Sequence, residues 1–290
     1  MRKCLALFFF SLLAMSSAVY AEGQGLYNQG LELKSGLEHI FKSGFKDHET
    51  EVSRTRYGVQ ADYSFFTLGY EYSHYSWNDP GDAGIAENGD NPWDGLNNIY
   101  LAADVLFPLR DDWSLNVAAG ISSSFEKEVS RSFGGSARII FRRAFDNGWT
   151  AGIGAVGVYH PVRSIFIPAV GLAYAKPAGE GWSARIGVPV TMVRYGFNQD
   201  FALQAGANYS ARIYRLEDRS PVSEKGYFRE RSVRLGVQAE WNPADNMILQ
   251  AGPYYMVARK WQIFDRRDNR LNSMDLKSAP GVEASLTWRF

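Results

Sequence analysis

His74 and Ser76 are the residues whose types and spacing come closest to a catalytic pair. They follow a segment with apolar or aromatic residues at positions 66, 68, 70 and 72, so a strand would project all six side chains from one face. A histidine can act as general base toward a serine nucleophile when a carboxylate orients the imidazole. Both residues can equally be polar side chains at the rim of a tyrosine-rich surface, and we favour this interpretation.

A second group of side chains that could bind a ligand is acidic. The segment from Asn78 to Gly95 has carboxylates among glycine and proline residues, namely Asp79, Asp82, Glu87, Asp90 and Asp94. Oxygen ligands at this density could hold Ca²⁺, but their spacing matches no EF-hand loop, so a solvated segment is the preferred interpretation. The histidines at 39, 48 and 160 do not pair at the spacing of a zinc site. We therefore predict no metal and no cofactor.

Charge and composition narrow the class of protein. The 31 Lys and Arg residues balance 31 Asp and Glu residues, so the chain lacks the positive excess that nucleic-acid binding requires. No stretch of the chain approaches 18 consecutive apolar residues, which argues against membrane-spanning helices. The 18 Phe, 16 Tyr and 8 Trp residues favour strands and interfaces.

Residues 1–21 have the pattern of a cleaved secretory signal. Arg2 and Lys3 precede an apolar run from Leu5 to Met15, and small residues lead to Ala21, after which we place the cleavage site. The only cysteine, Cys4, would be removed with this segment. An exported chain of residues 22–290 without disulfides must be held together by extensive backbone pairing or by a membrane.

The chain that follows alternates between apolar and polar residues with a period of two. The pattern is clearest in 282–290, 233–241 and 201–213, and it recurs in 57–63, 113–121 and 137–142. This period predicts strands. Short turns rich in Gly, Asn, Asp or Pro alternate with long polar segments at 78–95, 217–226 and 265–279, which is typical of a meander with short turns at one rim and long loops at the other.

Together these features resemble the bacterial outer-membrane β-barrel class, whose last strand ends in an aromatic residue as Leu286-Thr287-Trp288-Arg289-Phe290 does here. The resemblance implies location in the outer membrane of a Gram-negative bacterium, contact with outer-membrane lipids and lipopolysaccharide, and an insertion signal for the barrel-insertion machinery at Trp288 and Phe290. Four tryptophans next to short turns are predicted to form a girdle at the lipid interface: Trp113, Trp149, Trp182 and Trp241.

We predict one all-β domain at 22–290, a closed antiparallel transmembrane β-barrel with an up-and-down meander of about 12 to 14 strands. Such barrels place the apolar face on lipid and the polar face on the lumen. The predicted lumen charges are Arg56, Asp62, Glu71, Arg138, Arg142, Arg185, Arg212, Arg234 and Glu240. They could line a solute path or form a salt-bridged filling. Inward glycines at 120, 152, 154, 171, 206 and 236 favour a water-filled lumen.

The predicted function is therefore a structural barrel or a passive small-solute channel, and we favour a role without enzymatic activity. Two alternatives stay open. The segment His74-Tyr75-Ser76 resembles the His-x-Ser element of outer-membrane lipid A deacylases, which implies an acidic partner about a dozen residues on, here Glu87. Those enzymes are smaller barrels with the element near the C-terminus, and Trp77 replaces their polar residue after the serine. The second alternative is an adhesin or receptor that binds through its loops.

Overall fold

The computed structural model describes residues 30–82, 85–86, 89–175 and 180–290, and the predicted signal segment lies outside these ranges. None of the described segments is a helix long and apolar enough to span a membrane. The described residues form fifteen strands: β1 (Leu31–Gly44), β2 (Glu51–Tyr63), β3 (Phe66–Asn78), β4 (Gly95–Pro108), β5 (Trp113–Phe125), β6 (Phe133–Ala144), β7 (Trp149–Tyr159), β8 (Ile165–Tyr174), β9 (Gly181–Gly187), β10 (Val190–Gly196), β11 (Phe201–Arg215), β12 (Tyr227–Ala244), β13 (Met247–Phe264), β14 (Arg270–Asp275) and β15 (Ala279–Arg289).

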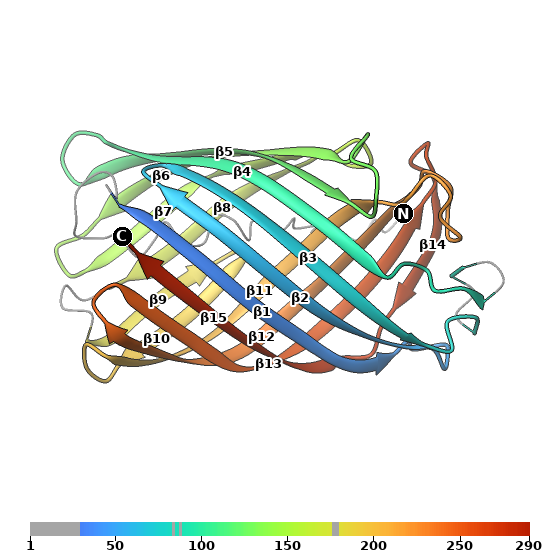
Figure 1. Ribbon diagram of the computed structural model, residues 1–290. Coiled ribbons are helices and arrows are strands. Elements are labelled where there is room, and N and C mark those ends of the chain that lie inside the picture. The colour runs from blue at the N-terminus through green and yellow to red at the C-terminus, as the bar shows by residue number, and fades with distance from the viewer. Residues whose placement is uncertain (1–29, 83–84, 87–88, 176–179) are drawn as a thin grey trace, which may run out of the picture.

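Fourteen of the described strands form a closed wall (Figure 1). Consecutive strands pair antiparallel, β1 pairs with β15, and the pairs β12–β13 and β13–β15 complete the circle. β14 pairs only with β13, beyond the wall. The predicted up-and-down barrel is confirmed, and its strand number is the upper end of the predicted range because the segment Trp182 to Tyr195 supplies β9 and β10.

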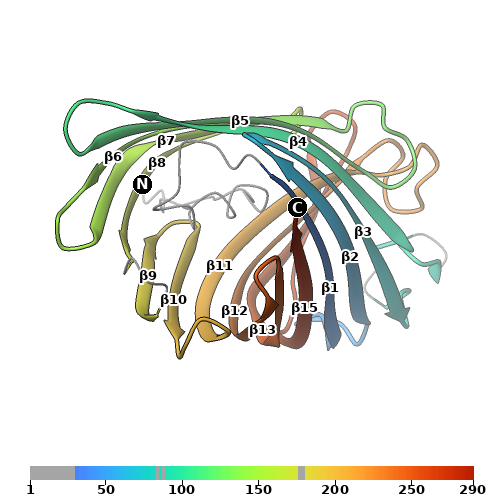
Figure 2. The ribbon, with the colours of Figure 1, turned by 60° about the vertical axis from the view of Figure 1, so that its left-hand side comes forward.

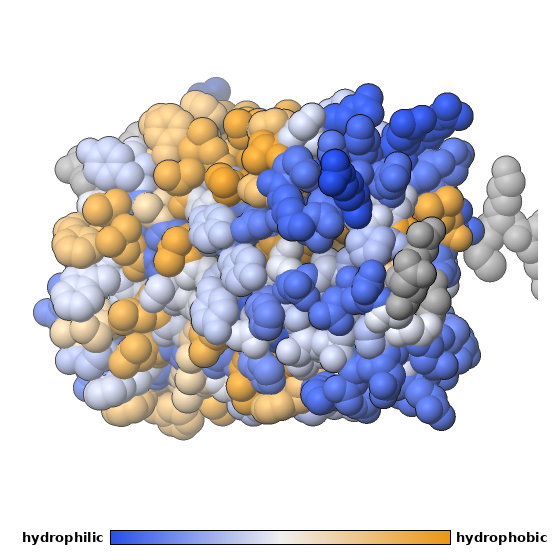
Figure 3. All heavy atoms as spheres, turned by 45° about the vertical axis from the view of Figure 1, so that its right-hand side comes forward, coloured by the Kyte–Doolittle hydropathy of each residue, from blue (hydrophilic) through white to orange (hydrophobic). Residues whose placement is uncertain are grey.

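The outer face of the wall is apolar. Among its exposed side chains are Val59, Leu68, Ile121, Ile153, Phe166, Val170 and Val237. Figure 3 shows apolar side chains gathered over the strands and hydrophilic ones at the end where the long connections lie. We call the latter the loop end and the opposite end, with Leu31 and Phe290, the turn end. This apolar exterior with charges inside is the membrane-barrel arrangement, whereas a soluble barrel would be the reverse.

An aromatic cluster fills the interior at the loop end. Trp261 of β13 lies at its centre, with ring centroids 5.0 Å from Phe228 and 5.6 Å from Trp93. The other buried members are Phe45, Val52, Tyr75, Ile85, Leu96, Tyr214, Leu216, Ile263, Met274 and Leu276. They come from β2–β4, β11–β14 and adjoining connections, so the cluster joins opposite sides of the barrel.

β11 leaves the wall as it approaches the loop end. Its ladder with β10 stops at the pair Val190↔Asn208, whereas Arg215 at its other end pairs with Phe125 of β5. Figure 2 shows β11 curving away from β8 behind the short β9 and β10. The loop-end part of β11 therefore crosses the barrel interior.

The aromatic cluster predicts the effect of Trp261→Ala. Removing this ring, which is 3% exposed, should lower the free energy of unfolding by about 3–5 kcal/mol because a buried cavity replaces the indole. Urea unfolding of the protein in lipid vesicles measures this change. Trp182→Ala is the control, since Trp182 is 59% exposed and lies outside the cluster. Equal losses in both variants would contradict a stabilising cluster at the loop end.

Candidate functional site in the barrel interior

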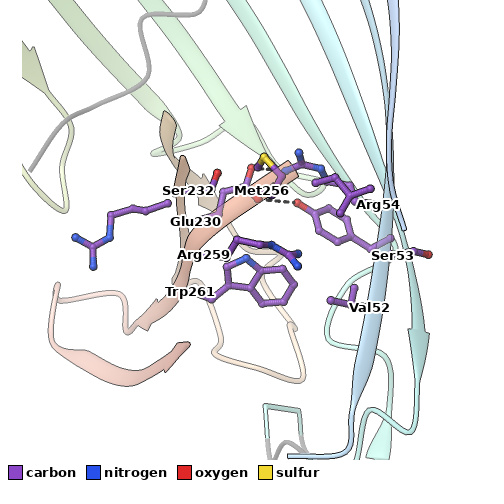
Figure 4. A pocket seen from close by; sticks show the side chains of 11 residues that line it. Val52, Ser53, Arg54, Glu230, Ser232, Met256, Arg259 and Trp261 are labelled. Atoms are coloured by element: carbon purple, nitrogen blue, oxygen red, sulfur yellow. Dashed lines mark hydrogen bonds and ion pairs between the residues drawn. The ribbon is translucent and has the colours of Figure 1, made fainter. Parts of the chain in front are cut away.

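An ion-pair network lies next to the aromatic cluster, on its turn-end side. Arg54 Nη2 lies 2.5 Å from Glu38 Oε1, and Arg54 Nη1 lies 2.8 Å from Glu230 Oε2. Arg56 Nη2 is 3.1 Å from Glu230 Oε1, and the Tyr75 hydroxyl donates to Glu230 over 3.4 Å. Figure 4 shows Arg54 of β2 and Glu230 of β12 pointing toward one another, with Trp261 below them. These contacts join β1, β2, β3 and β12 across the interior.

The network continues as further pairs of opposite charge. Arg212 pairs with Glu71, and Arg234 with Glu283. Toward the turn end, Arg138 Nη2 lies 2.6 Å from Asp104 Oδ2, Arg194 Nη2 lies 2.7 Å from Glu240 Oε1, and Lys34 Nζ lies 3.0 Å from Asp62 Oδ2. Removing one partner of such a pair leaves an uncompensated charge in a poorly hydrated site. The interior thus presents both signs of charge.

The predicted lumen charges all lie on strand faces that point inward. Ion pairs hold Arg56, Asp62, Glu71, Arg138, Arg212, Arg234 and Glu240. Arg142 lies opposite Ser114 and Gly152, and Arg185 lies opposite Met192, on the same inward side. Their role in a solute path stays a prediction.

Sequence reasoning missed the centre of the network, which is Glu38, Arg54 and Glu230. Glu38 lies in a strand whose alternation is poor, and Glu230 lies in a charged run, so neither stood out. The two-residue spacing of Arg54 and Arg56 was the available signal, because it places both guanidinium groups on one face of a strand.

A cavity of about 110 Å³ with both polar and apolar lining separates the crossing part of β11 from the inner face of β3–β7, and we call it the polar cavity after its serines and its ion pair. Arg212 and Glu71 lie at its boundary. Much of the remaining lining is small or hydroxyl-bearing: Gly120, Ser122, Ser124, Ser132, Gly134, Gly135 and Ser136. Of the inward glycines in the prediction, Gly120 borders this cavity, whereas at Gly236 the Tyr254 side chain lies 3.1 Å from an ideal Cβ position and fills the space.

His160 also borders the cavity and is 6% exposed. Its Nδ1 accepts a hydrogen bond from the Val162 N–H over 3.2 Å, so Nε2 carries the ring proton. Within the described residues, Nε2 is buried and has no hydrogen-bond partner. Burial and the nearby Arg229 lower the pKa of His160 to about 4, which keeps the ring neutral at ordinary pH. His160 thus offers one N–H donor.

The possible catalytic pair lies on the opposite face of the wall from this interior. His74 and Ser76 are exposed on the lipid-facing side of β3 near the loop end, as the alternation predicts. Glu87 lies outside the described residues, so the arrangement of all three is not on view. In the neighbouring loop, Asp82 accepts the Glu49 N–H over 2.6 Å. The lipid A deacylase-like role of His74, Ser76 and Glu87 stays a prediction.

The tryptophans of the predicted girdle gather at the turn end. Trp113 and Trp149 begin β5 and β7, Trp182 lies near the start of β9, and Trp241 lies near the end of β12. Trp113, Trp182 and Trp241 are exposed on the outer face, and Trp288 stacks with Phe290 at a centroid distance of 6.1 Å. Their roles at the lipid interface and in insertion stay predictions.

A second contact holds β11 inside the barrel at the loop end. The loop after β5 meets the loop after β11, where Glu126 Oε2 accepts the Glu217 N–H over 2.9 Å and Glu128 Oε2 accepts the Asp218 N–H over 3.2 Å. Lys127 also pairs with Glu217. Burial raises the pKa of Glu126 to about 7. We call this contact between the two loops the loop clasp.

The closed wall, apolar exterior and charged interior define a β-barrel of the bacterial outer-membrane class. The chain belongs to the family described as a domain of unknown function, DUF6268, which matches residues 87–289. A search of curated proteins gave no match.

Comparison with solved structures returned other barrels of low identity. The outer membrane channel COG4313 from Pseudomonas putida F1 is 7% identical with a TM-score of 0.47, and the match covers 93% of this chain and 98% of that one. A KdgM porin in complex with disordered oligogalacturonate is 8% identical with a TM-score of 0.36, over 89% and 99% of the two chains. The NanC porin is 11% identical with a TM-score of 0.36, over 90% and 100%.

The Arg212–Glu71 pair predicts strongly non-additive substitutions. Arg212→Met alone should lower the free energy of unfolding by about 3–5 kcal/mol because it leaves the Glu71 carboxylate without its partner. The double variant with Glu71→Met should be more stable than Arg212→Met, since no unpaired charge remains. Urea unfolding of the two single variants and the double variant tests this. A double variant whose loss equals the sum of the single losses would contradict the coupling.

The loop clasp predicts a pH dependence. Because the pKa of Glu126 rises from 4.5 to about 7 on folding, the folded protein binds more protons than the unfolded chain between these values. The free energy of unfolding should therefore fall as pH rises from about 4.5 to 7. Glu126→Gln should flatten this slope, measured by urea unfolding at several pH values. Glu128→Gln serves as the control, and an unchanged slope in Glu126→Gln would refute the assignment.

Proposed function

We propose that this protein is a passive outer-membrane channel for small solutes, with a narrow lumen of mixed charge. The observation that carries the proposal is the polar cavity between β11 and the inner face of β3–β7. Hydroxyl and glycine lining leaves space that water and polar groups can occupy, unlike the aromatic cluster beside it. We infer that the solute path follows this side of the interior.

Paired charges set the expected selectivity. Rings of one sign favour counter-ions, whereas the described interior alternates arginine with carboxylate. We therefore expect small conductance steps with little preference between anions and cations. The Arg138–Asp104 pair on β6 and β4 is suited to a test because each partner can be neutralised separately.

Neutralising the two partners should shift selectivity in opposite directions. Asp104→Asn leaves net positive charge in the path and should favour anions, whereas Arg138→Gln should favour cations. Reversal potentials in a planar bilayer with a tenfold salt gradient measure both shifts, with heat-modifiable gel migration as the check for a folded barrel. Asp245→Asn, in the turn between β12 and β13, is the control and should shift neither. Insertion of folded protein without conductance would overturn the proposal.

A further inference from the structure

The wall has an interval in which β8 has a neighbour on one side only. β8 pairs with β7 from Ile165 to Tyr174, but its ladder with β9 covers only Gly171 to Tyr174. Within the described residues, no strand pairs with Ile165–Val170 on the other side. This interval lies above the turn that joins the short β9 and β10, as Figure 2 shows.

Pro168 indicates that the sequence of β8 suits a strand that is paired on one side only. Pro168 lies opposite Ala155 of β7, and proline has no N–H with which to form a hydrogen-bonded pair. The pair with Ala155 must therefore be a non-hydrogen-bonded one, so the carbonyl group of Pro168 points away from β7 and toward the interval. Proline cannot donate to a ladder, so within sheets it occurs at edges, at strand starts and at bulges, and at an edge it leaves one backbone donor fewer without a partner. The edge is thus a feature of the sequence as well as of the fold.

The lipid-facing side of β11 continues from the outside of the barrel into its interior. Phe201, Leu203 and Ala205 are exposed on the outer face. The next residues on the same face are half-buried, and Ala211 and Ile213 are fully buried and border the polar cavity. One uninterrupted face of a single strand therefore leads from lipid to the cavity. We call residues 201, 203, 205, 207, 209, 211 and 213 the β11 stripe.

The interval has a frame on its remaining sides. At the loop end, Ile165 packs against a buried apolar cluster formed by Ile213, Tyr227 and Phe264. On the side of the interval that faces the turn end, the boundary is the turn between β9 and β10. In this turn the Gly187 N–H lies 3.3 Å from Thr191 Oγ1. We call the region bounded by β8, this turn, β11 and the apolar cluster the β8–β11 window.

We propose that the β8–β11 window is a lateral portal through which an amphipathic small molecule passes between the outer-membrane lipid and the polar cavity. Its apolar part would lie along the β11 stripe, and its oxygen-bearing head would occupy the cavity. This inference rests on the proposed channel function for the path beyond the cavity, but the portal itself can be tested separately.

The cavity has the chemistry to bind such a head group. The buried His160 Nε2–H lacks an acceptor within the described residues, and serine hydroxyls line the same space. Arg212 also lies at the boundary, where its Nη1 donates to Glu71, and its other guanidinium N–H groups are further charge-assisted donors. A carboxylate or carbonyl oxygen can accept from these groups, whereas a hydrocarbon would leave the imidazole donor unsatisfied. Carboxylic acids with an alkyl chain are therefore the class of solute expected.

A photolabelling experiment tests the portal. Protein purified from outer membranes is reconstituted into vesicles with a diazirine derivative of decanoic acid, irradiated and mapped by mass spectrometry. Label is expected on interior residues such as Val158 and Ile213, and unlabelled decanoic acid should compete with it. Decane should compete at least about tenfold less well, since it has no head group. Equal competition by decane would overturn the head-group assignment.

Ala207→Trp is the variant that obstructs the stripe beside the β9–β10 turn, because Ala207 lies opposite Thr191 of β10. Leu235→Trp is the matched control, since Leu235 is the cross-strand partner of Ala207 on β12, at the same depth and on the same outer face. Interior labelling should fall about tenfold in Ala207→Trp and persist in Leu235→Trp. Labelling confined to lipid-exposed residues, or equal in both variants, would overturn the portal.

Bilayer conductance separates the portal from the channel. Conductance without interior labelling would refute the portal and leave the proposed channel standing. Interior labelling that Ala207→Trp blocks, in a protein that does not conduct, would support the portal and refute the channel.

Discussion

The whole molecule depends on the absence of hydrogen-bond partners in hydrocarbon, which obliges a chain in the membrane to pair its own backbone. Fourteen described strands meet this requirement by closing on themselves through β1–β15 and β12–β13. Closure also fixes the side-chain pattern, because alternate residues must then face lipid and lumen. The alternation in the sequence is the direct trace of that constraint. In β8, Ile165–Val170 pairs on one side only, and Pro168 in this interval leaves one backbone N–H fewer without a partner.

A wall of this size encloses more space than small side chains fill. One side of the interior is filled by long side chains, whereas the other side contains a cavity. On the side of β1–β3 and β11–β13, long arginine and glutamate side chains reach across to one another beside the aromatic cluster. On the side of β4–β7, glycine and serine leave the polar cavity open. The filled side holds the crossing part of β11 in place, and the open side is where solute chemistry has room.

Much of the fold could be predicted from the sequence because period-two alternation and turn residues are local signals. The alternating segments 57–63, 113–121 and 201–213 lie within β2, β5 and β11 of the structure. The ion pairs of the interior were harder to predict, because Glu230 and Arg54 are 176 residues apart in the sequence and no local pattern encodes their pairing. The crossing of β11 was also hidden, because Ala211 and Ile213 continue the alternation that marks lipid-facing residues. Only burial distinguishes them from Leu203.

The contact between Arg215 of β11 and Phe125 of β5 has a consequence for folding. Neighbouring strands of a meander pair over short stretches of chain, and such local contacts form fast. The Arg215–Phe125 pair instead joins two strands that are not neighbours, across the inside of the barrel. The pair closes a much longer stretch of chain than the turn between two neighbouring strands does, and such closure costs more conformational entropy. The topology of this barrel therefore includes a non-local contact that a simple meander lacks.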